Sequence, residues 1–334
     1  MFSYDQARDA FTILDLLRGD LKIQGPPTST RDFFHGVLYY YVVAPGYFFG
    51  HGSPIIAAVW LSAINSLGIF ISYFMALRLL NNHFWAGITA LLIALSYEQT
   101  QYAIYLANTA LAPLSVPLIY FGLWLWRHQK NAGPLLTGLA LGLSFQANFI
   151  FIYHLVVVII FLIFSQVRSS PQHVAAFLSV FFITTSSMWL SEIRFGFPSR
   201  LGPAGLLSRT TYSRLKVSPV TILITSAHQF KRLVSLNTLP THPSLALVLF
   251  GICYLGFGVF GRKPDWWWPF SLGLISFAPP LILGGISTPY IHAGLGFLVI
   301  FFLVFFLSRV TVGYPILTAV LLVPLVFSNL SYIK

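Results

Sequence analysis

The chain has 334 residues, of which 57% are hydrophobic and 8% are charged, and its net charge is +11. Soluble domains carry roughly a quarter charged residues, so this composition excludes a soluble globular domain. The cations lie in separate connections between apolar runs and form no single basic stripe, so no nucleic-acid partner is expected.

Residues 5–18 predict an amphipathic helix that lies along a membrane surface. At a helical period of about 100° per residue, one face is apolar and the other is polar. The apolar face holds Ala7, Ala10, Phe11, Ile13, Leu14 and Leu17, and the polar face holds Asp5, Arg8, Asp9, Thr12 and Asp15. Gly25-Pro26-Pro27 ends this region, and the tyrosine-rich segment 35–41 follows. We therefore assign residues 1–50 to an extracytoplasmic loop with juxtamembrane helices.

The remainder, residues 51–334, predicts a transmembrane domain of about ten apolar spans, each near the length that crosses a bilayer as a helix. The expected spans are 54–77, 83–97, 109–126, 132–147, 149–166, 173–192, 244–260, 266–285, 294–308 and 310–331. Backbone polar groups inside a bilayer must be satisfied within each segment, which favours helices. The expected fold is an all-α polytopic bundle.

The cations in the short connections predict the orientation of these spans. Alternate connections hold Arg78, Arg127 with Lys130, Arg168, Arg262 with Lys263, and Arg309, whereas those near 98–108, 147–149 and 286–293 hold no lysine or arginine. The first set is cytoplasmic by the positive-inside rule, which places residues 1–50 and the long loop 193–243 outside. The seven cations of that loop suit an anionic ligand or anionic lipid headgroups.

Five of the eight acids fall within the first 32 residues. Asp5 and Asp9 are four residues apart and therefore share one helical face, where one could accept a proton while Arg8 moderates the charge. A structural alternative makes Asp5 a helix N-cap and leaves Asp9 on a solvated face. Spacing alone does not decide between these interpretations.

The first 45 residues carry a family resemblance. The run Tyr4-Asp5-Gln6-Ala7-Arg8-Asp9-Ala10, followed by Gly19-Asp20, Gly25-Pro26-Pro27 and the segment from His35 to Pro45, resembles the first external loop of GT-C membrane glycosyltransferases. The nearest group is that of bacterial protein O-mannosyltransferases and aminoarabinose transferases. Relatives have a transmembrane helix before this loop, so relative to them the sequence begins inside the loop. Many have two adjacent acids where this chain has Asp5 and Gln6.

The resemblance implies a set of site residues. It assigns the catalytic acid to Asp5, with Asp9 second, and donor-phosphate binding to Arg194, Tyr290 and His292. Structural alternatives are an ion pair of Arg194 with Glu192 and an interfacial cap for His292. Further expected site residues are Arg8, His35, Tyr40, Glu98 and Glu192.

The implied activity is inverting sugar transfer from a polyprenyl-phosphate donor to a lipid, glycan or protein acceptor, on the extracytoplasmic side of the cell membrane. The expected partners are membrane lipid and the lipid-linked donor. No cofactor and no metal site are predicted, because the nine histidines are scattered, although some relatives use a divalent ion beside the acidic loop. The alternatives are a transporter or flippase for a lipid-linked or anionic solute and an inactive assembly partner. The sequence indicates no oligomeric state.

Overall fold

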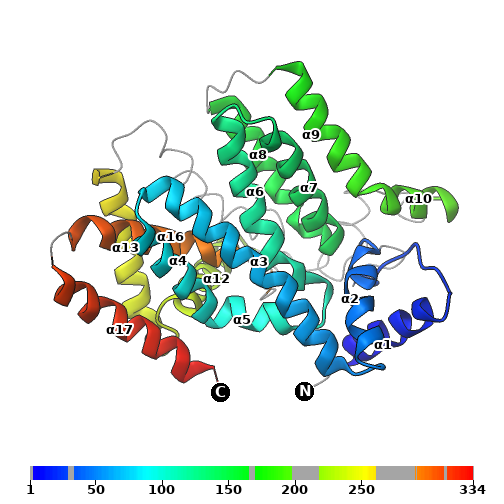
Figure 1. Ribbon diagram of the computed structural model, residues 1–334, viewed down its shortest axis with the longest axis horizontal. Helices are drawn as coiled ribbons and strands as arrows, with labels where there is room; N and C mark the ends of the chain where they lie inside the picture. Colours follow the sequence, from blue (N-terminus) through cyan, green and yellow to red (C-terminus); the bar gives the residue numbers. More distant parts are fainter. Residues whose placement is uncertain are drawn as a thin grey trace. The chain divides into compact units, whose positions relative to one another are not determined.

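The computed structural model describes residues 3–28, 34–164, 170–197, 218–260, 290, 292–311 and 314–333. Within these ranges the chain is all-helical, with fourteen α-helices and two short 3-10 helices (Figure 1). Pro27 and Phe34 form an isolated antiparallel bridge. The helices divide into two compact units, Met1–Asn65 with Ala103–Ser218 and Ser66–Tyr102 with Pro219–Lys334. The all-α prediction is confirmed for the described residues.

The first unit is built around α7, Ala132–Ala147, which packs against its sequence neighbours on two sides. The other elements are α1 Tyr4–Leu17, α2 Leu38–Phe49, the start of α3 Pro54–Leu80, η1 Asn108–Leu111, α6 Ala112–Arg127, η2 Phe149–Ile152, α8 Tyr153–Phe164, α9 Pro171–Thr184 and α10 Ser186–Arg194. Glycines allow α7 to approach α6 and α9 closely. A Cβ on Gly133 would lie 2.2 Å from the backbone nitrogen of Trp126, and one on Gly138 would lie 2.5 Å from the carbonyl oxygen of Phe177.

The second unit has α16, Gly296–Val310, at its centre, and nearly every apolar side chain of this helix is buried. It packs against α4, α12 and α13, and α17 packs against α4. The bounds are α4 His83–Leu95, α5 Tyr97–Ile104, α12 Pro219–Asn237, α13 Pro243–Phe260 and α17 Pro315–Tyr332. Residues 219–237 belong to the predicted long loop 193–243 and form the helix α12.

Nine of the predicted spans fall on helices, and the tenth, 266–285, lies outside the described residues. Two described stretches, Pro54–Leu80 and Asn108–Arg127, are long and apolar enough to cross a membrane by themselves. Helices α9 and α10 meet at a bend of 53° and make a third if the pair is one span. The other apolar helices are shorter, and the bundle of about ten spans stays a prediction.

The segment 1–50 packs within the first unit rather than forming a unit of its own. Ile13 and Leu16 of α1 contact a buried cluster formed with α2, the start of α3 and the segment 106–111. Its members include Tyr39, Tyr40, Val43, Tyr47, Leu61, Leu106 and Leu111. Burial of this apolar surface fixes α1 against α2, which positions the acids of α1.

Candidate active site on the N-terminal helix

Helix α1 begins with a capping box that leaves Asp5 outside the cap. The Ser3 hydroxyl accepts a hydrogen bond from the backbone nitrogen of Gln6 at 3.4 Å, and the Gln6 side chain accepts one from the backbone nitrogen of Ser3 at 2.9 Å. The alternative that made Asp5 the N-cap is therefore wrong. Gln6, the neighbour of Asp5, completes the cap.

Asp5 and Asp9 differ sharply in exposure, although they share one face of α1. The Asp5 side chain is 72% exposed, whereas that of Asp9 is 4% exposed. The prediction of a solvated Asp9 is thus wrong, because Asp9 faces the buried side of α1 together with Ile13 and Leu16. In turn Phe11 and Leu17 of the predicted apolar face are exposed. Asp9 tolerates burial because charged and polar partners surround its carboxylate.

Arg8 connects the two acids. Its Nη1 lies 2.8 Å from Asp5 Oδ1, while Nη2 and Nε lie 2.8 and 3.0 Å from Asp9 Oδ1. Tyr40 of α2 donates its hydroxyl to the same Asp9 oxygen at 3.1 Å. Asp5 Oδ2 makes no hydrogen bond to a described residue. The four residues Asp5, Arg8, Asp9 and Tyr40 are hereafter the acid cluster.

The electrostatics of the acid cluster follow from burial. Desolvation raises the pKa of Asp9, and the hydrogen bond and charge of Arg8 oppose this rise. Desolvation also raises the pKa of Tyr40, and the neighbouring Asp9 charge raises it further. Tyr40 therefore stays protonated and keeps donating to Asp9, which holds the buried carboxylate in place.

His35 lies near this cluster in a protected position. Its ring stacks on Phe149 with 5.5 Å between centroids, and its Nδ1 is buried without a hydrogen-bond partner among the described residues. Desolvation lowers the pKa of His35 to about 3, and the charge of Arg8 lowers it further. His35 is therefore neutral at physiological pH.

Gln146 connects Gly36, which precedes α2, to the end of α9 and the start of α10. This residue was not singled out from the sequence. Its backbone oxygen accepts from the Gly36 nitrogen at 2.9 Å, and its Nε2 donates to Thr184 O at 2.8 Å and Ser187 Oγ at 2.7 Å. A Cβ on Gly36 would lie 1.7 Å from Gln146 Oε1, so only glycine fits there. The available signal was a lone amide within an apolar span.

The three residues predicted to bind donor phosphate divide between the units. Arg194 ends α10 in the first unit, is exposed, and forms no ion pair with a described residue. Tyr290 and His292 precede α16 in the second unit, and His292 is buried. Glu192 lies on α10, half-exposed. Arg200, Arg209, Arg214 and Lys216 of the predicted basic loop lie outside the described residues.

Glu98 lies in a buried polar network of the second unit. Its Oε2 accepts from Asn237 Nδ2 at 2.6 Å, and Asn237 Oδ1 accepts from Ser96 Oγ at 2.6 Å and Gln99 Nε2 at 3.3 Å. Burial raises the pKa of Glu98 to about 8, against opposing contributions from the Asn237 hydrogen bond and the Arg232 charge. Glu98, one of the further expected site residues, is 3% exposed.

Comparisons with protein families, with curated proteins and with solved structures found no match to this chain.

No group of three or more His, Cys, Asp or Glu side chains suited to a metal ion occurs among the residues that the structure describes. The acid cluster offers two carboxylates, of which that of Asp9 is buried and binds Arg8 and Tyr40 through Oδ1. What the acid cluster offers chemically is one accessible carboxylate fixed by a buried framework.

Proposed function

We propose that the chain is a membrane glycosyltransferase that moves a sugar from a polyprenyl-phosphate donor to an acceptor on the extracytoplasmic face. One observation carries the proposal: Arg8 binds an exposed carboxylate, Asp5, and a buried one, Asp9, at the same time. The resemblance of the first 45 residues to GT-C enzymes supports it.

The two acids suit different tasks. Asp9 is held by three hydrogen bonds from Arg8 and Tyr40, so a change in its protonation would disturb the packing of α1 on α2. Asp5 keeps Oδ2 open, and a general base must reach the proton that it removes. Asp5 is therefore the proposed base, and Asp9 is a positioning residue that acts through Arg8.

The proposed reaction is a single displacement at the sugar's anomeric carbon. Asp5 takes the proton of the acceptor hydroxyl, the acceptor oxygen forms a bond to the anomeric carbon, and the bond to the carrier phosphate breaks. The phosphate leaves with the bonding electron pair, and inversion follows from attack on the opposite face. Stabilising the leaving phosphate contributes much of the rate in such a step. Of the residues that the resemblance implies for that role, Arg194 lies in the same unit as Asp5 and is the one that we propose.

The experiment is Asp5→Asn in the full-length protein, assayed in membranes with a labelled polyprenyl-phosphate sugar. Asparagine keeps the size and the hydrogen bonding of aspartate but removes its basicity. We expect transfer to fall about 10²–10⁴-fold, the usual contribution of a general base. Because Asp5 is exposed, the melting temperature of the variant should match that of the wild type.

Two variants on the same helix serve as controls. Asp15→Asn removes an acid whose side chain is 49% exposed and whose partner is Arg18 at 3.3 Å, so transfer should persist. Asp9→Asn should lower both stability and transfer, since Arg8 loses its buried partner. Normal transfer by Asp5→Asn with normal protein levels would refute the proposed base.

The alternative function is a transporter, which the buried Glu98 favours. A carboxyl group buried in a membrane protein is a recognised feature of proton-coupled transport. Proton-coupled uptake that Glu98→Gln abolishes and Asp5→Asn leaves intact would favour this alternative over the transferase.

A further inference from the structure

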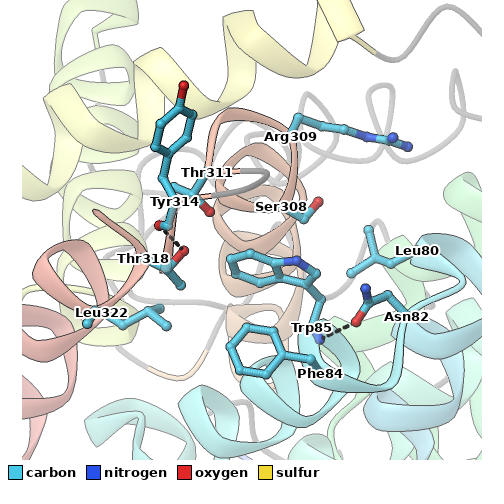
Figure 2. Close-up of a pocket in the computed structure, with 11 residues that line it drawn as sticks. Leu80, Asn82, Phe84, Trp85, Ser308, Arg309, Thr311, Tyr314, Thr318 and Leu322 are labelled. Atoms are coloured by element: carbon cyan, nitrogen blue, oxygen red, sulfur yellow. Dashed lines mark hydrogen bonds between the residues drawn. The ribbon is translucent and has the colours of Figure 1, made fainter. Parts of the chain in front are cut away.

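A cavity of about 610 Å³ opens in the second unit, where four helices end or begin. Its lining comes from the end of α3, the start of α4, the end of α16 and the start of α17 (Figure 2). The lining includes Asn82, Phe84, Trp85, Arg309, Tyr314 and Leu322. We call this cavity the helix-end pocket.

The helix-end pocket is expected to lie at the depth of the membrane–water interface. The connection from α3 to α4 and the connection from α16 to α17 both border it. The positive-inside rule predicts that these connections, with Arg78 and Arg309, lie on the cytoplasmic surface. Tryptophan and tyrosine favour this depth in a bilayer. Phospholipid headgroups lie at the same depth.

The helix-end pocket presents hydrogen-bond donors. Arg309 forms no ion pair with a described residue, and its guanidinium lies 5.4 Å from the ring centroid of Phe305. Asn82 Oδ1 accepts from the Trp85 backbone nitrogen at 3.2 Å, which leaves its amide protons for a ligand. Neither the Trp85 indole nor the Tyr314 hydroxyl donates to a described residue. Arginine and neutral donors together match a phosphate group.

Three hydroxyl groups next to these donors add hydrogen-bond acceptors to the pocket. Ser308, Thr311 and Thr318 donate their protons to helix carbonyls at 2.6, 2.8 and 3.2 Å. Their oxygens are left as acceptors, which suit the hydroxyl groups of a glycerol headgroup. In addition, α17 begins without a side-chain cap, and uncapped helix N-termini attract phosphate.

The apolar part of the lining suits a lipid chain. Phe84 and Trp85 meet edge to face with 5.2 Å between ring centroids, and both lie in the lower half of Figure 2 with Leu322 across from them. Arg309 and Tyr314 extend from the upper half of the same view. Polar donors and an apolar wall in one pocket are complementary to an amphiphile rather than to a free anion.

We propose that the helix-end pocket binds the headgroup of an anionic phospholipid, with the phosphate on Arg309 and an acyl chain along Phe84 and Leu322. This site lies on the predicted cytoplasmic surface and takes no part in the sugar transfer proposed above. Its test is therefore independent of that function.

The test measures lipid retention by the purified full chain in mild detergent. Native mass spectrometry counts bound lipid after titration with phosphatidylglycerol, with phosphatidylcholine as the zwitterionic reference. The wild type should retain phosphatidylglycerol preferentially, and Arg309→Gln should weaken this binding about tenfold, the size expected for one charge-assisted contact. Ala319→Trp, which fills the pocket from an exposed position without a charge change, should weaken it as well.

Arg78→Gln is the matched control, since Arg78 is also exposed near the end of α3 but does not line the pocket. Equal losses from Arg78→Gln and Arg309→Gln would show general surface attraction and overturn the proposal. Unchanged binding in both Arg309→Gln and Ala319→Trp would also overturn it. Displacement of the lipid by millimolar inorganic phosphate would assign the pocket to the free anion instead.

Discussion

Replacement of Glu98 by glutamine should stabilise the protein at alkaline pH. The folded-state pKa of Glu98 is raised from 4.5 to about 8 by burial. The folded protein therefore holds a proton over a pH range in which the unfolded chain has lost it. The stabilising contribution of this proton is complete below about pH 4.5 and is lost as pH rises through 8.

The magnitude follows from the size of that shift. Each pKa unit corresponds to about 1.4 kcal/mol, so full ionisation of Glu98 lowers the free energy of unfolding by at most about 5 kcal/mol. Glutamine keeps an oxygen that accepts from Asn237 and cannot ionise. Glu98→Gln should therefore match the wild type at pH 5 and exceed it by several degrees in melting temperature at pH 9.

Thermal unfolding followed by tryptophan fluorescence, from pH 5 to 9, measures both curves. Glu192→Gln is the matched control, because it makes the same replacement at a half-exposed acid on α10. A wild-type melting temperature that stays constant up to pH 9, or a Glu98→Gln variant less stable at every pH, would refute the reasoning. Either result would mean that Glu98 is ionised and compensated in its buried site.

Three further predictions concern the first unit and the topology. Gly36→Ala should lower the free energy of unfolding by about 1–3 kcal/mol, because the added Cβ would overlap Gln146 Oε1. Gly87→Ala is the control, because the space around its Cβ is open, and it should be neutral or stabilising in thermal unfolding. Tyr40→Phe removes a hydrogen bond to Asp9, so it should lower the free energy of unfolding by about 1 kcal/mol and slow the proposed sugar transfer. The control is Tyr41→Phe, which removes an exposed hydroxyl that donates to Lys22 O at 2.8 Å and should change little in either assay. In a Cys253→Ser background, cysteines placed at Tyr4 and Val220 should both react with an impermeant thiol reagent applied from outside. Reaction at either position only after membrane disruption would contradict the predicted topology.

Hydrophobic run length predicted the helices well, because the requirement to satisfy backbone groups within apolar segments leaves few alternatives. The break between α9 and α10 was not predicted, since Thr184 and Thr185 interrupt the helix without a proline or glycine signal. The helix α12 was also missed, because Lys231, Arg232 and several polar residues lower its apolar character. Its buried Asn237 packs against Gln99 and Glu98.

The site was predicted in part. The pairing of Arg8 with both neighbouring acids is compatible with spacing along one helix, and Tyr40 was among the expected residues. Burial of Asp9 could not be predicted from periodicity, because the buried face of α1 is set by contacts with α2 and the segment 106–111. The hydrogen bond between Glu98 and Asn237 likewise could not be predicted, since the two residues lie 139 positions apart in the sequence.

The contacts of Gln146 involve no group that ionises in the physiological pH range. Its amide and backbone tie Gly36 to Thr184 and Ser187, and all of these groups stay neutral. The spacing between the start of α2 and the bend before α10 should therefore stay constant as the pH changes. The contacts of Gln146 thus give these two elements a fixed frame of reference, whatever the protonation of the neighbouring acids.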